Sequence, residues 1–124
     1  MKTPKPVLDR RRSLRIAEKL PFKIGHEGFE AEAITVNISL NGALCLVERE
    51  IPLMTQLKIA LSLPLDSKGS PAKKKILLMK GVVVRKEKDP SSDQYCIAIY
   101  FSQIKPSDRK FLNQFIESRL PSAA

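Results

Sequence analysis

The sequence predicts an all-β fold that ends in one helix. Six short segments of strand character, separated at regular spacing by turn-forming residues, are typical of a small antiparallel barrel. A change of apolar period near residue 106 indicates a single amphipathic helix laid against that barrel. The chain has 124 residues, of which 43% are hydrophobic, and this is enough for one globular domain with an ordinary core.

The first strand is expected at residues 20–24, followed by a turn at 26–28. Pro21 suits the start of a strand or an edge strand, because proline cannot donate a ladder hydrogen bond. Strand side chains alternate between two faces. One face of this strand is therefore expected to be apolar, through Leu20, Phe22 and Ile24.

The second strand, expected at residues 29–39, ends with two small polar residues. Alternation places Asn37 and Ser39 on one face of that strand. The other face is expected to be apolar, through Ile34, Val36 and Ile38. Asn41 and Gly42 follow, and this pair readily adopts the positive φ angles that a type I′ hairpin turn requires. A third strand is then expected at 43–47.

The remaining strands are expected at residues 57–63, 76–85 and 95–101. The fourth strand alternates cleanly, with an apolar face formed by Leu57, Ile59, Leu61 and Leu63. The fifth is almost continuously apolar, and Gly81 within it indicates a bulge or a point of close packing. A polar loop precedes this strand and ends in three consecutive lysines at 73–75.

The helix is expected to begin with Ser107 as its N-cap. Asp108 would then lie in the first turn, where the helix dipole favours a carboxylate, and Pro121 would end the helix. One apolar stripe follows helical spacing, through Phe111, Leu112, Phe115, Ile116 and Leu120. We expect a single domain over residues 10–120, a flexible N-terminal arm at 1–9 and a C-terminal tail at 121–124.

The net charge of +9 and the pI near 9.8 favour an anionic partner. Nucleic acid, a nucleotide, phosphate and a membrane surface all fit that charge, and so does a basic protein with no such partner. The apolar runs are far too short to span a membrane, so no membrane insertion is expected. Cys45 and Cys96 lie in apolar strands and no signal peptide is recognisable, which favours the reducing cytoplasm.

No residue pattern supports catalysis or metal binding. Ser39 lacks a neighbouring base, and the single histidine, His26, lies in a turn without an orienting carboxylate. The sequence contains no CxxC pair, no cluster of metal ligands and no glycine-rich phosphate loop. We therefore expect no enzymatic activity, no catalytic or metal-binding residue and no cofactor.

A basic cluster precedes the first strand and contains Arg10, Arg11, Arg12 and Arg15. A guanidinium group is a planar fork that binds phosphate or the O6/N7 edge of guanine bidentately. Arg11 and Arg15 are four residues apart, so both could reach opposite sides of one compact ligand. Taken alone, the cluster is more typical of a solvated basic tail, and the polar pair in the second strand is more typical of a strand-end cap.

Considered together, the two polar clusters form a more specific pattern. An RRxxxR motif at Arg10, Arg11 and Arg15 is followed about twenty residues later by an NxSxxG motif at Asn37, Ser39 and Gly42. In this order, with these strands and a closing helix, the chain resembles the PilZ domain family from about residue 9 to residue 120. That family comprises receptors for the bacterial second messenger cyclic di-GMP. The resemblance implies a six-stranded antiparallel barrel of the split-barrel type, capped by a helix.

The resemblance also implies a ligand site. Arg10, Arg11 and Arg15 would bind phosphates and guanine edges, Asn37 and Ser39 would bind guanine or phosphate, and Gly42 would keep the turn open. Asn37 departs from the acidic residue of the family motif, and Cys96 and Ala98 occupy a region where relatives often carry glycine. An arginine at position 10 tends to accompany two stacked ligand molecules, so two molecules of cyclic di-GMP per protomer are expected.

The expected function is that of a cyclic di-GMP receptor and adaptor. Its arginine arm would close over the ligand and present a new surface to a partner protein. One alternative is a small basic barrel that binds single-stranded nucleic acid, which the charge and the lysines at 73–75 favour. The scarcity of aromatic residues for base stacking makes nucleic acid the less favoured partner. The other alternative is an adaptor of the same fold that works without a ligand.

Overall fold

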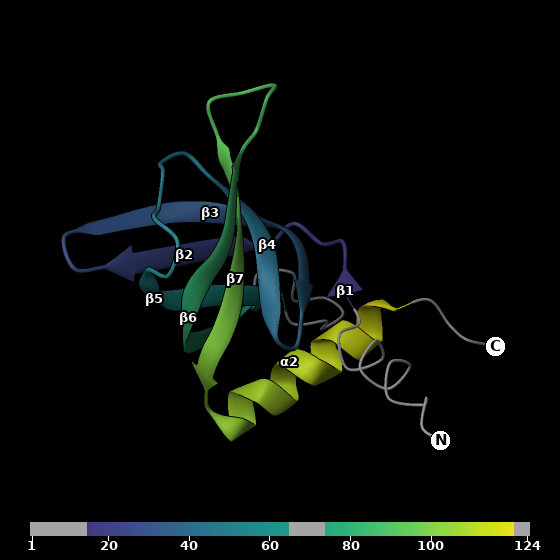
Figure 1. Cartoon of the computed structure of the whole chain (residues 1–124). Helices are drawn as coiled ribbons and strands as arrows, with labels where there is room; N and C mark the ends of the chain where they lie inside the picture. The colour runs from purple at the N-terminus through teal and green to yellow at the C-terminus, as the bar shows by residue number, and fades with distance from the viewer. Residues whose placement is uncertain (1–14, 65–73, 121–124) are drawn as a thin grey trace, which may run out of the picture.

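The computed structural model describes residues 15–64 and 74–120 (Figure 1). The expected arm at 1–9, the tail at 121–124 and Arg10, Arg11 and Arg12 lie outside the described residues. The helices and strands of the described residues are β1 (Arg15–Ile16), β2 (Pro21–His26), β3 (Phe29–Ser39), β4 (Gly42–Val47), β5 (Gln56–Pro64), β6 (Lys74–Lys88), β7 (Tyr95–Ile104) and α2 (Pro106–Arg119).

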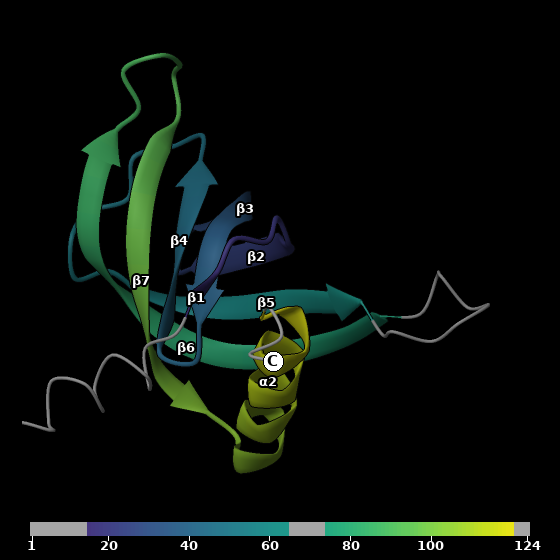
Figure 2. The same ribbon diagram turned by 90° about the vertical axis from the view of Figure 1, so that its right-hand side faces the viewer.

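Six of these strands form a closed antiparallel barrel, as predicted. β2, β3 and β4 form one meander of sequential neighbours, and β5, β6 and β7 form a second. Pairing of β2 with β5 and of β4 with β7 joins the two meanders and closes the barrel. Figures 1 and 2 show α2 packed at one end of this barrel, beside β1.

β1 is a strand that the sequence patterns do not predict. Its two residues, Arg15 and Ile16, pair with Ser39 and Ile38 at the end of β3. Ile16 is buried, and Arg15 is exposed. β1 therefore adds a short seventh strand at the rim, and it places an arginine of the first motif beside the second motif.

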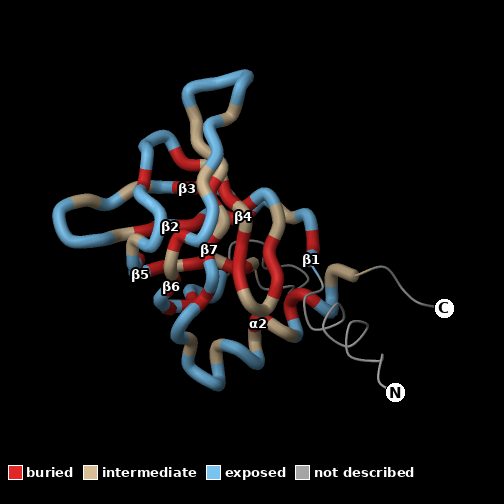
Figure 3. The backbone as a smooth tube through the Cα atoms, viewed as in Figure 1, coloured by how far each residue is buried: buried red, intermediate tan, exposed pale blue. Residues whose placement is uncertain are grey.

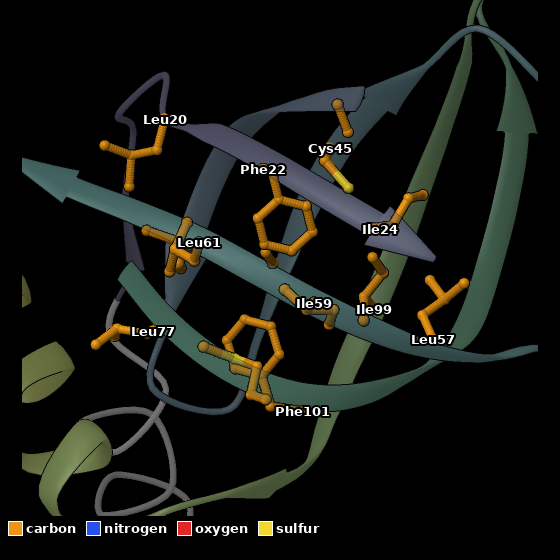
Figure 4. Close-up of a cluster of buried hydrophobic side chains, with 14 of the residues drawn as sticks. Leu20, Phe22, Ile24, Cys45, Leu57, Ile59, Leu61, Leu77, Ile99 and Phe101 are labelled. Carbon is orange, nitrogen blue, oxygen red and sulfur yellow. The ribbon is translucent and has the colours of Figure 1, made fainter. Parts of the chain in front are cut away.

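The core fills the barrel and the space between the barrel and α2. The predicted apolar faces of β2 and β5 are both buried, which confirms the alternation in those strands. Figure 4 shows Phe22 of β2, Ile59 of β5 and Ile99 of β7 pointing into one interior. Figure 3 shows the same alternation along the strands, whereas the β2–β3 turn and most of the β6–β7 connection are exposed.

β6 is longer than predicted and is irregular at two positions. The pairing with β7 shifts between Lys80 and Gly81 and again between Val83 and Arg85. A Cβ atom on Gly81 would lie 2.6 Å from Ile99 Cγ2 and 2.9 Å from Ile59 Cδ1. Gly81 is therefore both a bulge position and a point of close packing, as the sequence predicts.

The helix begins two residues earlier than predicted. Pro106 already lies in the first turn of α2 and Lys105 is the N-cap, so the prediction of Ser107 as N-cap is wrong. Proline suits this position because its fixed φ matches the helix and its missing N–H needs no partner. Asp108 lies in the first turn, as predicted. Leu112, Phe115 and Ile116 are buried against the barrel, while Pro121 lies outside the described residues.

Candidate functional site

The second motif lies where β3 changes register. Thr35 pairs with Cys45 and Asn37 pairs with Leu44, so Val36 is an extra residue in the ladder. Such a bulge reverses which positions face inward. Thr35 and Ile38 are both buried, whereas Ile34 and Val36 are 51% and 38% exposed. The prediction that Ile34, Val36 and Ile38 share one apolar face is therefore wrong.

Arg15 and Asn37 are brought together across 22 positions of sequence. The Nη1 atom of Arg15 donates a hydrogen bond to Oδ1 of Asn37, at 2.8 Å. Arg15 lies opposite Ser39 in the β1–β3 ladder, so Asn37 is its diagonal neighbour. One residue of each sequence motif thus contributes to a single polar cluster on the surface of the barrel.

Ser39 is fully buried and its hydroxyl group is used within the turn. The Oγ atom donates to the carbonyl oxygen of Gly42 and accepts from the backbone N–H of Asn41, both at 3.2 Å. The backbone N–H of Phe101 in turn donates to the carbonyl oxygen of Asn41, at 2.8 Å. Ser39 therefore fixes the turn between β3 and β4, which is bonded to β7 as well.

Glycine is required at position 42 by the close approach of β7, and not by a positive φ angle as the sequence suggested. Among the described residues, only Gly28 and Met54 have positive φ, so the predicted type I′ turn at Asn41 and Gly42 is wrong. A Cβ atom on Gly42 would instead overlap the carbonyl oxygen of Ile99 on β7. Close approach of two backbones excludes a side chain at this position.

The segment that carries Arg15 is anchored to both β3 and α2. Thr35, which is fully buried, donates its hydroxyl proton to the carbonyl oxygen of Glu18 and accepts from the N–H of Leu20, at 2.8 Å. The carboxylate of Glu18 accepts a hydrogen bond from Nε of Arg119 near the end of α2, at 3.2 Å. No local sequence signal predicts these partners, because the groups are distant in the chain.

An outward-facing surface extends from Asn37 across the barrel. The ladder places Asn37 beside Leu44 of β4, then Ala98 of β7, then Arg85 of β6. Leu44 and Ala98 are half-buried, and Arg85 is exposed. We call these four residues the Asn37 row. It combines an apolar floor with a polar group at one end and a cation at the other, and the sequence patterns do not identify its last three members.

The two thiols are not activated. Burial raises the pKa of the Cys45 thiol to about 12, with Cys96 contributing in the same direction. Burial is also the main reason that the pKa of the Cys96 thiol is raised, with the charge of Glu87 second. The raised pKa values keep both thiols protonated near neutral pH. Because only a thiolate is a good nucleophile or metal ligand, both thiols are unreactive there.

The remaining titratable groups form no metal site within the described residues. No three histidine, cysteine, aspartate or glutamate side chains there lie close enough to hold an ion. His26 bonds through Nδ1 to the carbonyl oxygen of Gln56, at 2.7 Å, so this nitrogen carries the proton. No helix in the described part of the chain is long and apolar enough to cross a membrane.

Aromatic side chains are mostly unavailable on the surface. Phe22 and Phe101 are buried in the core, and Phe29 lies beneath the guanidinium group of Arg49, 4.2 Å from the ring centroid. Tyr100 is 52% exposed. Base-stacking proteins present several aromatic faces along one groove, and the described surface has no such row.

Comparison with known proteins identifies the family. The PilZ domain family matches residues 9–118. No match to this chain was found among curated proteins. Among solved structures, one similar chain is the inhibitor of motility MotI/DgrA of Bacillus subtilis, with a TM-score of 0.75 and 23% sequence identity. The match covers 89% of this chain and 50% of MotI, so this chain spans about half the length of that relative.

Two further similar structures contain cyclic di-GMP. The PilZ domain of YcgR from Escherichia coli has a TM-score of 0.59 and 16% identity, over 89% of this chain and 91% of that one. PlzA of Borreliella burgdorferi has a TM-score of 0.58 and 13% identity, over 97% of this chain and 58% of PlzA. The barrel, the two sequence motifs and the family match lead to one conclusion: this chain belongs to the PilZ domain family.

Proposed function

We propose that this protein is a cytoplasmic receptor for cyclic di-GMP. Its site would comprise Arg10, Arg11, Arg15, Asn37, Ser39 and Gly42. The observation that carries the proposal is the hydrogen bond between Arg15 and Asn37, which joins the two motifs at one place on the barrel. The YcgR and PlzA structures, which contain cyclic di-GMP on the same fold, support it. The free thiols of Cys45 and Cys96 suit the reducing cytoplasm.

The hydrogen bond between Arg15 and Asn37 leaves N–H donors on both side chains for binding the ligand. A guanidinium group has five N–H donors, and the bond to Asn37 uses one of those on Arg15. The others are available for bidentate binding of a phosphate. Asn37 accepts through its oxygen, so its amide N–H groups remain to donate to the O6/N7 acceptors of guanine. Leu44 and Ala98 provide an apolar floor for the base, and Gly42 and Ser39 hold the adjoining turn.

Arg10 and Arg11 would complete the site by binding the ligand in addition to Arg15 and Asn37. Fixing a backbone residue costs about 1–2 kcal/mol, so ordering a six-residue arm costs roughly 6–12 kcal/mol. A micromolar ligand has a net binding free energy of about −8 kcal/mol. Exposed ion pairs contribute only about 0–1 kcal/mol each, so several bidentate contacts are needed to hold the arm down. We infer that Arg10 and Arg11 close over bound ligand and that the closed arm presents a new surface to a partner protein.

Calorimetric titration with cyclic di-GMP tests the receptor function. Saturable binding by the wild-type chain is expected, with an affinity loss of about tenfold or more in Arg11→Ala and Arg15→Ala. Arg109→Ala removes an exposed arginine on α2 and is the matched control, expected to bind like wild type. A wild-type chain that gives no binding would remove the proposal and favour a ligand-independent adaptor. Tight, steeply salt-dependent binding of single-stranded oligonucleotide instead would favour nucleic acid.

Hydrogen exchange tests the movement of the arm separately. Saturating cyclic di-GMP is expected to slow amide exchange over residues 8–16, because those amides become ordered against the ligand. Exchange in β5, which β2 separates from β3, serves as the internal reference and is expected to be unchanged. Equal exchange over residues 8–16 with and without ligand would contradict closure while leaving the binding result intact.

A further inference from the structure

A second surface, away from the Asn37 row, carries lysines that the fold does not neutralise. Lys58 of β5 lies directly opposite Lys80 of β6 in the ladder. Lys23 lies on the adjacent strand, β2, two positions from the residue that faces Lys58. All three are exposed, and within residues 15–64 and 74–120 none of them forms an ion pair. We call Lys23, Lys58, Lys80 and the neighbouring Leu78 the lysine face.

The barrel does not require this arrangement of charge. Like charges directly opposite each other on neighbouring strands are destabilising, so the Lys58–Lys80 pair opposes folding. Glu30 and Glu32 of β3 lie directly opposite Gly25 and Lys23 in the β2–β3 ladder. Neither of them lies within ion-pair distance of a lysine of this face. Lys23 therefore has an opposite charge across the ladder, whereas the charges of Lys58 and Lys80 remain available to a partner.

The lysine face forms part of an open hollow of about 1980 Å³. Lys105 and Arg109, at the start of α2, line the same hollow and add to its positive charge. In Figure 1 this region lies around β5, β6 and the start of α2, with the β2–β3 hairpin projecting on one side. Lys23, Lys58, Lys80, Lys105 and Arg109 thus bring five cations to the lining of one open hollow.

Apolar groups lie directly beside these cations. Leu78 and Ile76, on the outward positions of β6, are 61% and 54% exposed. Ala60 of β5 lies opposite Leu78, so the surface between the two strands is apolar. Burying a leucine side chain contributes more binding free energy than an exposed ion pair does. Leu78 can therefore contribute more to affinity than the lysines, which set orientation and rate of association.

We propose that the lysine face docks an acidic segment of another protein. Carboxylates of that segment pair with Lys58 and Lys80, and a neighbouring apolar side chain covers Leu78 in the adjacent Ala60–Leu78 pair. Glu27, Glu30 and Glu32 line one wall of the hollow. They repel a continuous polyanion such as nucleic acid or an anionic membrane, but a polypeptide can place a basic residue against them. This mixed charge is why a protein segment fits the face better.

The test uses the full chain without cyclic di-GMP, so its outcome is independent of the receptor function. The probe is a short synthetic peptide of alternating glutamate and leucine with one terminal arginine. An NMR titration is expected to give saturable, salt-sensitive shifts of the amides of Lys58, Leu78 and Lys80. The amides of Arg15 and Asn37 are expected to be unchanged.

Two double charge-reversal variants distinguish binding at the lysine face from non-specific attraction of the acidic peptide to a basic protein. Lys58→Glu/Lys80→Glu keeps a like-charged pair across the two strands, so the barrel is expected to fold, and peptide affinity is expected to fall about tenfold or more. Lys88→Glu/Lys110→Glu changes the net charge equally at exposed positions outside the hollow and is expected to bind like wild type. Lys80→Glu alone pairs with Lys58, so it provides a second folded variant that lacks the site.

Four results would overturn the proposal. The first is a titration without saturable shifts on β5 and β6. The second is equal binding of a peptide with glutamine in place of glutamate. The third is an equal loss of affinity in the two double variants. The fourth is tighter binding of oligothymidylate or phosphatidylglycerol vesicles at these same amides, which would assign the face to a polyanion.

Discussion

At the scale of single residues, the candidate site is defined by the hydrogen bond between Arg15 and Asn37 and by the glycine at position 42. Arg15 and Asn37 are hydrogen-bonded to each other across the β1–β3 ladder. Each side chain restrains the other, and a restrained side chain loses less conformational entropy when it binds a ligand. Gly42 contributes through the atoms that it lacks, since it lets the turn after β3 lie directly against β7.

Asn37→Asp is expected to raise affinity for cyclic di-GMP about fivefold. A carboxylate keeps the bond to Arg15 and can also accept from the N1 and N2 hydrogens of guanine. Charge-assisted hydrogen bonds exceed neutral ones by about 1 kcal/mol, which corresponds to that factor. Calorimetry measures the change, and Gln103→Glu, an equal charge change at an exposed position on β7, is the control. Unchanged binding would contradict this expectation, and weaker binding would show that the amide N–H groups of Asn37 are needed as donors to guanine O6/N7.

Gly42→Ala is expected to lower the free energy of unfolding by about 1–3 kcal/mol, because the added Cβ must displace backbone rather than a flexible side chain. Urea denaturation measures the loss. Gly25→Ala is the matched control, since a Cβ atom there finds only ordinary contacts, 3.7 Å from Glu30 Cγ and 3.8 Å from Phe29 O. Similar stability of the two variants would show that the β4–β7 approach relaxes easily.

At the scale of elements, the start of α2 is less stabilised than its sequence suggests. The N-cap residue, Lys105, makes no side-chain capping bond, and Ser107 lies inside the first turn instead. The helix is held mainly by the packing of Leu112, Phe115 and Ile116 and by the contact between Arg119 and Glu18. The stability of α2 thus comes more from its contacts with the rest of the protein than from interactions within the helix.

Lys105→Asp is expected to raise the free energy of unfolding by about 1 kcal/mol. The carboxylate would accept from a free N–H of the first turn and would also favour the positive end of the helix dipole. Thermal and urea denaturation check the gain. Ser107→Ala, at the residue that the sequence suggested as the cap, is expected to change stability by less than about 0.5 kcal/mol. A large loss in that variant would restore Ser107 to the capping role.

Elements with a regular local pattern are predictable from the sequence, and their irregular neighbours are not. The alternation in β5 and the stripe on α2 each repeat several times, so their buried faces are predicted correctly. Val36 is β-branched and suits a strand in any register, so the bulge leaves no local signal. β1 has only two residues, and it exists because β3 offers them a partner.

The same contrast applies to the candidate site. Residue types and spacing select Arg15, Asn37, Ser39 and Gly42 as a set. Their geometry depends on ladder register, which joins positions far apart in the chain. Leu44, Ala98 and Arg85 complete the Asn37 row only after β4, β7 and β6 are aligned, and no short motif contains all three.

At the scale of the whole molecule, the number of ligands bound is the next quantity to measure. Two stacked cyclic di-GMP molecules per chain are predicted, because an arginine at position 10 tends to accompany a stacked pair in the family that this chain resembles. Calorimetry is expected to give a stoichiometry of two for wild type and one for Arg10→Ala. A wild-type value of one would contradict the prediction without affecting the receptor function.

The two meanders have a consequence for how the chain folds. Each meander contains only hairpin pairings between consecutive strands, which need short loop closures and form early. The β2–β5 and β4–β7 seams join distant segments and must form when the two halves meet. The exposed stretch at residues 48–50, between the halves, is therefore a natural place to divide the chain. Fragments ending and beginning there would each carry a complete three-stranded unit and could reassemble along the two seams.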